Sequence, residues 1–182
     1  MNFSHNFRVL TAIAAVTLAP IAAHALSISG NNIVLTEDST VLVTFEGYSA
    51  AYTSDLALAL PVNGLGVLFT NQTASVGSTV LLGNFAAGTE LVFSLFVRND
   101  NVTYFTGLAT ANPDGVVHAK IALTLDGNKA NVGFEDLRGG GDKDFNDFLF
   151  SVTAQPVPDS AATVGLLALG LAALAVARRR LS

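Results

Sequence analysis

Residues 117–126 read VHAKIALTLD, and this stretch decides the fold. Apolar and polar residues alternate along it, which is typical of a half-buried antiparallel strand because successive strand residues point to opposite faces. The expected apolar face consists of Val117, Ala119, Ile121, Leu123 and Leu125. The expected polar face carries His118, Lys120, Thr124 and Asp126.

Other segments between the two ends of the chain have the same character. Residues 90–98 alternate as clearly, with Leu91, Phe93, Leu95 and Val97 on one face. Further strands are expected at residues 32–36, 40–47, 56–60, 65–70, 79–85, 131–134 and 148–153. Turn pairs such as Asn63-Gly64 and Asp126-Gly127 separate them. About nine short strands predict an all-β, antiparallel two-sheet β-sandwich of the jelly-roll kind.

The composition sets this domain, residues 26–155, apart from the two ends. It holds ten of the chain's 12 phenylalanines, enough for one core. It also holds 13 of the 14 acidic residues but only five of the nine basic ones. We therefore expect no nucleic-acid partner, because binding a phosphate backbone needs a basic face. The chain has no cysteine, which excludes disulfides, thiolate metal sites and cysteine nucleophiles.

Residues 1–25 read as a secretory signal peptide that forms an N-terminal helix. Arg8 precedes an apolar run that extends to Ile21, and Ala23-His24-Ala25 supplies small residues around a cleavage point after Ala25. The alternative is an N-terminal anchor helix. Pro20 and the shortness of the apolar run count against that alternative.

Residues 156–182 form a second terminal segment, made of a linker, an apolar run and a basic end. The 17 residues 161–177 would extend about 25 Å as a helix, near the lower limit for crossing a bilayer. Arg178, Arg179 and Arg180 follow and would stay in the cytoplasm. The pattern predicts a C-terminal hydrophobic, transmembrane helix that places residues 26–155 outside the cytoplasm.

This terminal segment resembles the PEP-CTERM sorting signals of bacteria, in the variant that opens Val-Pro-Asp-Ser-Gly. The motif residues are Val157, Pro158, Asp159 and Ser160, and the chain departs from the variant at Ala161. The resemblance implies a Gram-negative envelope, processing by an exosortase-type enzyme, and production of exopolysaccharide. It also implies a transient membrane anchor before release or retention at the cell surface. The alternative is a plain C-terminal anchor.

Residues 133–150 read GFEDLRGGGDKDFNDFLF and carry the chemistry. The candidate metal ligands are Glu135, Asp136, Asp142, Asp144 and Asp147, with Asp114 and Asn146 as further candidates. Clustered carboxylates repel one another unless a bound cation makes the electrostatic energy of the cluster favourable. Calcium prefers six to eight carboxylate and carbonyl oxygens in a flexible cage. The segment therefore predicts a calcium site, with a solvated acidic turn as the alternative.

The segment is not an EF-hand. That loop needs glycine at its sixth position and glutamate at its twelfth, and counting from Asp142 these positions hold Asp147 and Thr153. Adjacent strand residues point to opposite faces. Glu135 and Asp136 can therefore both point inward only if the strand ends before them.

The pattern GFEDL followed by GGGDKDFNDFLF is similar to the signature of domain of unknown function 4114, found in secreted bacterial proteins. Segments 82–90, 104–107 and 112–119 also fit, so the resemblance covers about residues 45–153. It implies a β-sandwich with a calcium site and no assigned activity. By that resemblance Asp114 and His118 match a second motif of the family.

His118 can be interpreted in two ways. A histidine beside acids can serve as a general base or a zinc ligand. We expect a hydrogen-bonding strand residue instead, since a zinc site would need further histidine or cysteine ligands.

Three functions follow, of which we favour an exported, non-catalytic and calcium-stabilised module of the cell surface or extracellular matrix. The second is a calcium-dependent module that binds carbohydrate (exopolysaccharide). Against it, the domain has no tryptophan and only Tyr48, Tyr52 and Tyr104 to stack on sugar rings. The third is a glycosidase that uses Glu135 and Asp144 as paired carboxylates.

Overall fold

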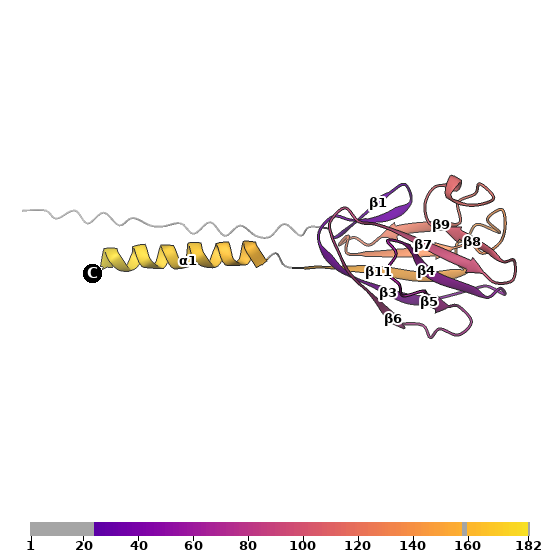
Figure 1. The fold of residues 1–182 in the computed structure, drawn as a ribbon, viewed down its shortest axis with the longest axis horizontal. Coiled ribbons are helices and arrows are strands. Elements are labelled where there is room, and N and C mark those ends of the chain that lie inside the picture. The colour runs from indigo at the N-terminus through magenta and orange to yellow at the C-terminus, as the bar shows by residue number, and fades with distance from the viewer. Residues whose placement is uncertain (1–23, 158–159, 182) are drawn as a thin grey trace, which may run out of the picture.

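The computed structural model describes residues 24–157 and 160–181. Two antiparallel sheets of six and five strands pack as a sandwich, and one helix, α1 (Ser160–Leu181), follows it (Figure 1). The predicted two-sheet sandwich with a C-terminal helix is confirmed, whereas the jelly-roll subclass stays a prediction. The predicted signal helix lies outside the described residues except for His24 and Ala25, and so do Pro158 and Asp159 of the sorting motif.

The six-stranded sheet has the order β1-β2-β7-β4-β5, with β8 paired to β7. Its strands are β1 (Leu26–Ser29), β2 (Asn32–Leu35), β4 (Ser54–Leu60), β5 (Val67–Thr70), β7 (Glu90–Val97) and β8 (Val102–Phe105). A short 3-10 turn, η1 (Ala109–Ala111), follows β8.

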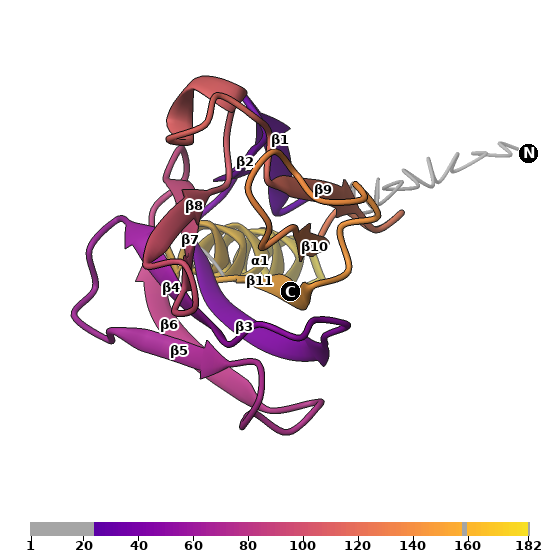
Figure 2. The ribbon, with the colours of Figure 1, turned by 90° about the vertical axis from the view of Figure 1, so that its right-hand side faces the viewer.

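The five-stranded sheet has the order β6-β3-β11-β10-β9. Its strands are β3 (Ser39–Gly47), β6 (Thr79–Phe85), β9 (Ala119–Leu123), β10 (Lys129–Phe134) and β11 (Phe148–Pro156). The central strand β11 pairs with β3 on one side and β10 on the other, which leaves β6 and β9 at the edges (Figure 2).

Aromatic rings join the two sheets. The ring of Phe93 on β7 lies 5.0 Å from that of Phe150 on β11, between ring centres, and Phe45 on β3 lies 5.8 Å from Phe69 on β5. Each such pair adds roughly 0.5–1.5 kcal/mol beyond its area burial. All buried apolar side chains of the described residues lie between Ala25 and Ala154. The sandwich therefore closes its own core, and residues 24–157 form a unit that can be studied alone.

The alternation along residues 90–98 is confirmed, because its four inward residues are fully buried. The prediction for residues 117–125 is only partly correct. Ala119 is buried, but Leu123 is exposed and Leu125 is fully exposed, because β9 is an edge strand that ends at Leu123. His118, expected on the polar face, is fully buried, since the strand begins only at Ala119.

Two strands, β1 and β8, were not expected from the sequence. Each has four residues, and β1 directly follows the segment interpreted as the signal peptide. The β1–β2 hairpin closes through Gly30 and Asn31, both with positive φ (56° and 60°), as a two-residue turn requires. Ala25, the residue before the expected cleavage point, is buried, and its carbonyl accepts a hydrogen bond from Thr36 N–H.

Within the described part of the chain, no helix is long and apolar enough to cross a membrane. The expected membrane span at residues 161–177 is not confirmed by this finding and stays a prediction.

The acidic loop, residues 135–147, connects β10 to its neighbour β11. Because β11 runs from this loop toward α1, the loop lies at the end of the sandwich away from the helix (Figure 1). The loop folds back onto the sheet at Gly133, where a Cβ would lie 2.0 Å from the carbonyl oxygen of Phe145. Only glycine fits at this crossing.

Replacing Gly133 by alanine should lower the free energy of unfolding by about 1–3 kcal/mol, because a backbone atom must move to admit the methyl group. Urea unfolding of residues 24–157 measures this. The control is Asn131→Ala on the exposed face of the same strand, expected to change stability by about 0.5 kcal/mol or less. Equal effects of both variants would contradict the close crossing.

Candidate metal centre

Three carboxylates of the acidic loop come together. Carboxylate oxygens of Glu135, Asp142 and Asp144 all lie within 4.8 Å of one another. Glu135 is 1% exposed, whereas Asp142 and Asp144 are exposed. One buried carboxylate next to two exposed carboxylates suits a hard divalent cation, which binds carboxylate oxygens.

Short turns hold the two aspartates in place. Asp142 Oδ1 accepts a hydrogen bond from Asp144 N–H (3.3 Å), and Asp144 Oδ1 accepts one from Asn146 N–H (3.1 Å). Lys143 and Phe145 adopt positive φ values of 65° and 57°, which turn the backbone sharply between the acids. The loop therefore alternates acidic side chains with strained residues, which is a costly arrangement for a solvated turn.

One oxygen of the Glu135 carboxylate is hydrogen-bonded and the other faces solvent. Oε1 accepts a hydrogen bond from Phe145 N–H, whereas no described residue donates one to Oε2, which is not fully buried. A Cβ on Gly141 would lie 2.5 Å from Oε2, so glycine leaves room for this oxygen. Burial raises the pKa of Glu135, the Phe145 N–H opposes this, and the neighbouring aspartates raise the pKa further. A cation at Oε2 would remove this penalty.

The other two predicted ligands form a separate pair. Asp136 is 3% exposed, and its backbone N–H donates to Asp147 Oδ2 (2.9 Å). Ser54 Oγ on β4 donates to Asp136 Oδ2 over a long 3.4 Å. Burial, followed by the charge of Asp147, raises the pKa of Asp136 to about 7. The five predicted ligands thus divide into a cluster of three and a separate pair, Asp136 and Asp147, in which the charge of Asp147 raises the pKa of Asp136.

Asp114 and His118 brace the loop from outside this cluster. His118 Nε2 lies 2.9 Å from Asp114 Oδ2, and its Nδ1 lies 3.0 Å from the Glu135 carbonyl oxygen. The same Asp114 oxygen accepts a hydrogen bond from Gly139 N–H (2.8 Å). Burial alone would raise the pKa of Asp114, but the Gly139 and His118 hydrogen bonds outweigh it and lower the pKa to about 2. The pair therefore fixes both ends of the stretch from Glu135 to Gly139.

The structure places the remaining sequence candidates as follows. Both Glu135 and Asp136 are buried because β10 ends at Phe134, which meets the condition derived from the sequence. The Asn146 amide nitrogen donates to Asp144, so its side chain braces a ligand. Tyr104, considered from the sequence only as a residue that could stack on a sugar, stacks its ring on His118 at 3.5 Å. Sequence reasoning missed Ser54, and no local signal marks it, since it lies 82 residues from Asp136.

Comparison with known families identifies the two parts of the chain. Residues 82–155 match the family model described as a domain of unknown function (DUF4114), and residues 156–181 match the VPDSG-CTERM motif. The chain carries a DUF4114 domain followed by a VPDSG-CTERM motif. The DUF4114 match begins within β6 and contains the whole acidic loop, so it is shorter at its N-terminal side than the expected 45–153.

The VPDSG-CTERM motif implies export to the cell surface and processing by an exosortase-type sorting system. No curated protein and no solved structure matches the chain.

Replacing His118 by phenylalanine should keep the stack on Tyr104 but remove both hydrogen bonds, which leaves the buried carboxylate of Asp114 without this partner. We expect a loss of about 2–4 kcal/mol in the free energy of unfolding, measured in urea. Tyr104→Phe is the control, expected to cost about 0.5 kcal/mol because the hydroxyl has no hydrogen-bond partner among the described residues. A neutral His118→Phe variant would show that the brace is dispensable.

The Asp136–Asp147 pair predicts an inverse pH dependence in the metal-free domain. Since the folded-state pKa of Asp136 lies near 7 and that of an unfolded aspartate near 3.9, the folded state binds the extra proton between about pH 4 and pH 7. The free energy of unfolding should therefore fall as the pH rises through this range, by about 2 kcal/mol after allowance for partial solvation.

Urea unfolding in EDTA at pH 4.5 and pH 7.5 measures this change. Asp136→Asn removes the titrating group and should flatten the profile. A slope that persists in the Asp136→Asn variant, or stability that rises with pH, would contradict the assignment.

Proposed function

We propose that the protein is an exported, non-catalytic module of the cell surface or extracellular matrix, and that calcium bound to Glu135, Asp142 and Asp144 stabilises its fold. One observation carries the proposal. A buried carboxylate, Glu135, has one oxygen without a hydrogen-bond donor among the described residues, and two exposed carboxylates lie within 4.8 Å of it.

The energetic role of the cation follows from where the loop is attached. The loop bridges β10 and β11, and its Asn146 carbonyl accepts a hydrogen bond from Ser49 N–H just after β3 (2.9 Å). An ion that neutralises Glu135 and its neighbours therefore secures three strands of one sheet. Because the unfolded chain cannot assemble these ligands, calcium stabilises the folded state by about 2.7 kcal/mol at 100 times the dissociation constant.

The direction of export gives this site a biological setting. The loop lies at the end of the sandwich away from α1, where a surface-attached domain meets its surroundings (Figure 1). Extracellular calcium is abundant and cytosolic calcium is scarce. Calcium binding would therefore lock the fold only after export, by the same mass action.

The non-catalytic part of the proposal rests on the crowding of the acids. Retaining and inverting glycosidases place two carboxylates about 5 Å or 6.5–9.5 Å apart, in environments that differ. Glu135 and Asp144 instead share their cluster with a third carboxylate, Asp142, as metal ligands do. Unchanged polysaccharide after incubation with the protein and calcium is the expected result. Hydrolysis abolished by Glu135→Gln, with calcium binding intact, would overturn this part.

Calcium should raise the melting temperature of residues 24–157 by roughly 8 °C relative to EDTA, at a calcium concentration of 100 times the dissociation constant. Differential scanning calorimetry measures the shift. In the Asp142→Asn/Asp144→Asn variant the shift should disappear, because both exposed ligands lose their charge.

The control is Asp100→Asn/Asp126→Asn, which removes two negative charges from hairpin turns outside the acidic loop. It should keep the full calcium shift. A shift that is absent from the unmodified domain, or lost equally in both double variants, would refute a specific calcium site.

A further inference from the structure

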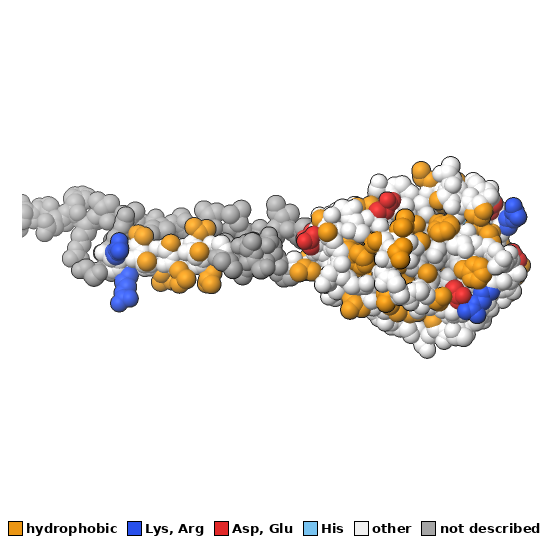
Figure 3. All heavy atoms as spheres, in the orientation of Figure 1, with side chains coloured by type: hydrophobic (Ala, Val, Ile, Leu, Met, Phe, Trp, Pro, Cys, Tyr) orange, Lys and Arg blue, Asp and Glu red, His pale blue; other side chains and the backbone are white. Residues whose placement is uncertain are grey.

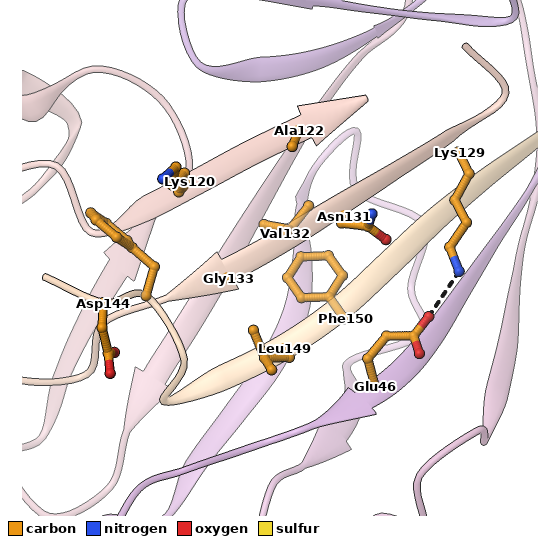
Figure 4. Close-up of a pocket in the computed structure, with 11 residues that line it drawn as sticks. Glu46, Lys120, Ala122, Lys129, Asn131, Val132, Gly133, Asp144, Leu149 and Phe150 are labelled. Atoms are coloured by element: carbon orange, nitrogen blue, oxygen red, sulfur yellow. Dashed lines mark hydrogen bonds and ion pairs between the residues drawn. The ribbon is translucent and has the colours of Figure 1, made fainter. Parts of the chain in front are cut away.

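A groove of about 360 Å³ crosses the outer face of the five-stranded sheet and ends at the acidic loop (Figure 4). The short side chain of Ala122 on β9 leaves the hollow open, whereas the space beside Gly133 on β10 is filled by the Phe145 carbonyl. Its volume lies within the range of small-molecule sites, roughly 300–1,000 Å³. Figure 3 shows a different face of the sandwich, where apolar side chains are scattered among polar ones.

Charged groups stand at the two ends of the groove. Lys120 and Asp144 lie at one end, and Lys129 lies at the other, where its Nζ is 3.0 Å from Glu46 Oε1 (Figure 4). Lys120 is exposed and has no hydrogen bond or ion pair with any described residue. Only five basic residues occur between residues 26 and 155, and two of them border this groove.

The next step rests on the proposed calcium site. Because Asp144 is both a groove residue and a member of the cluster, a bound ion would lie at the Lys120 end. Calcium takes six to eight oxygens. Glu135 offers only Oε2, because its Oε1 is hydrogen-bonded to Phe145 N–H, so even two chelating aspartates bring the number of carboxylate oxygens to five. Coordination positions therefore remain for oxygens of a ligand, with a lysine amine beside them.

The residues that line the groove indicate which kind of ligand it could bind. Leu149 on β11 forms an apolar floor, and the aromatic ring of Phe145 adds a wall, whereas the side chains of Val132 and Phe150 are buried in the core beneath. The central strands β10 and β11 are paired on both sides, so in the groove only the edge strand β9 offers free backbone groups to a peptide strand. Sugar rings need no such groups, since their C–H faces pack on apolar and aromatic atoms while their hydroxyls stay hydrated.

The geometry points to a binding groove for an oligosaccharide of uronic acids. Oxygens of one sugar residue complete the coordination of the calcium ion, and a carboxylate of the ligand pairs with Lys120. The apolar side chains of Leu149 and Phe145 hold the faces of the rings.

Isothermal titration calorimetry of residues 24–157 with a galacturonate tetramer tests this inference. We expect saturable binding in calcium that weakens at least tenfold in EDTA. A neutral glucose tetramer of the same length should bind at least tenfold more weakly than the galacturonate tetramer. Short oligomers are used because long polyuronates form gels with calcium.

Two variants test the groove without touching the metal ligands. Ala122→Phe fills the hollow from an exposed position of an edge strand, and Lys120→Met removes the amine. Each should weaken galacturonate binding at least tenfold and keep the calcium shift in melting temperature. The matched control is Arg98→Met, which removes a positive charge just after β7, outside both the groove lining and the acidic loop, and should keep both.

The outcomes separate the two proposals. No calcium shift in melting temperature would refute the proposed function and this inference with it. Calcium binding without galacturonate binding would refute the groove inference alone. So would binding that resists EDTA, equal binding of the neutral tetramer, or affinity unchanged by Ala122→Phe. A dimer in sedimentation that Ala122→Phe dissociates would assign the groove to a second copy of the chain instead.

Discussion

The acidic loop is folded around the buried carboxylate of Glu135. Glu135 is 1% exposed, and burying a carboxylate costs free energy unless it is paired; its Oε2, the oxygen that solvent reaches, has no hydrogen-bond donor among the described residues. Around it the backbone is strained at Lys143 and Phe145, which have positive φ. Three successive glycines in the same loop also adopt positive φ, which glycine does without strain. A divalent cation at the proposed site would reverse the sign of this cost and let the loop hold several acids in so small a volume.

The sandwich positions this loop with little freedom. The pair Phe134 and Phe148 closes the β10–β11 hairpin, Gly133 lets the loop cross the sheet, and the Asp114–His118 pair fixes its first half. Without disulfides, the domain depends on packing and on this closure for its cohesion. With the proposed ion in place, the groove that ends at Asp144 would give the same loop a second role, since that ion would also contact a ligand in the groove.

Local sequence patterns predicted most strands and the acidic loop, because alternation and clustered acids are properties of neighbouring residues. They failed where the environment is set at long range. Leu125 belongs to an alternating run but lies in a turn beyond an edge strand, and His118 belongs to a polar face but lies under Tyr104. The division of the acids into Glu135, Asp142 and Asp144 on one side and Asp136 with Asp147 on the other depends on where β10 ends, which spacing alone does not reveal.

A crystal structure of residues 24–157 grown in calcium chloride would test the calcium site. We expect one ion, identified by its anomalous scattering, with oxygens of Glu135, Asp142 and Asp144 at about 2.3–2.6 Å. Glu135 Oε2 should be among them. A cluster that holds only water at millimolar calcium, or an ion bound elsewhere while Glu135 stays free, would contradict it.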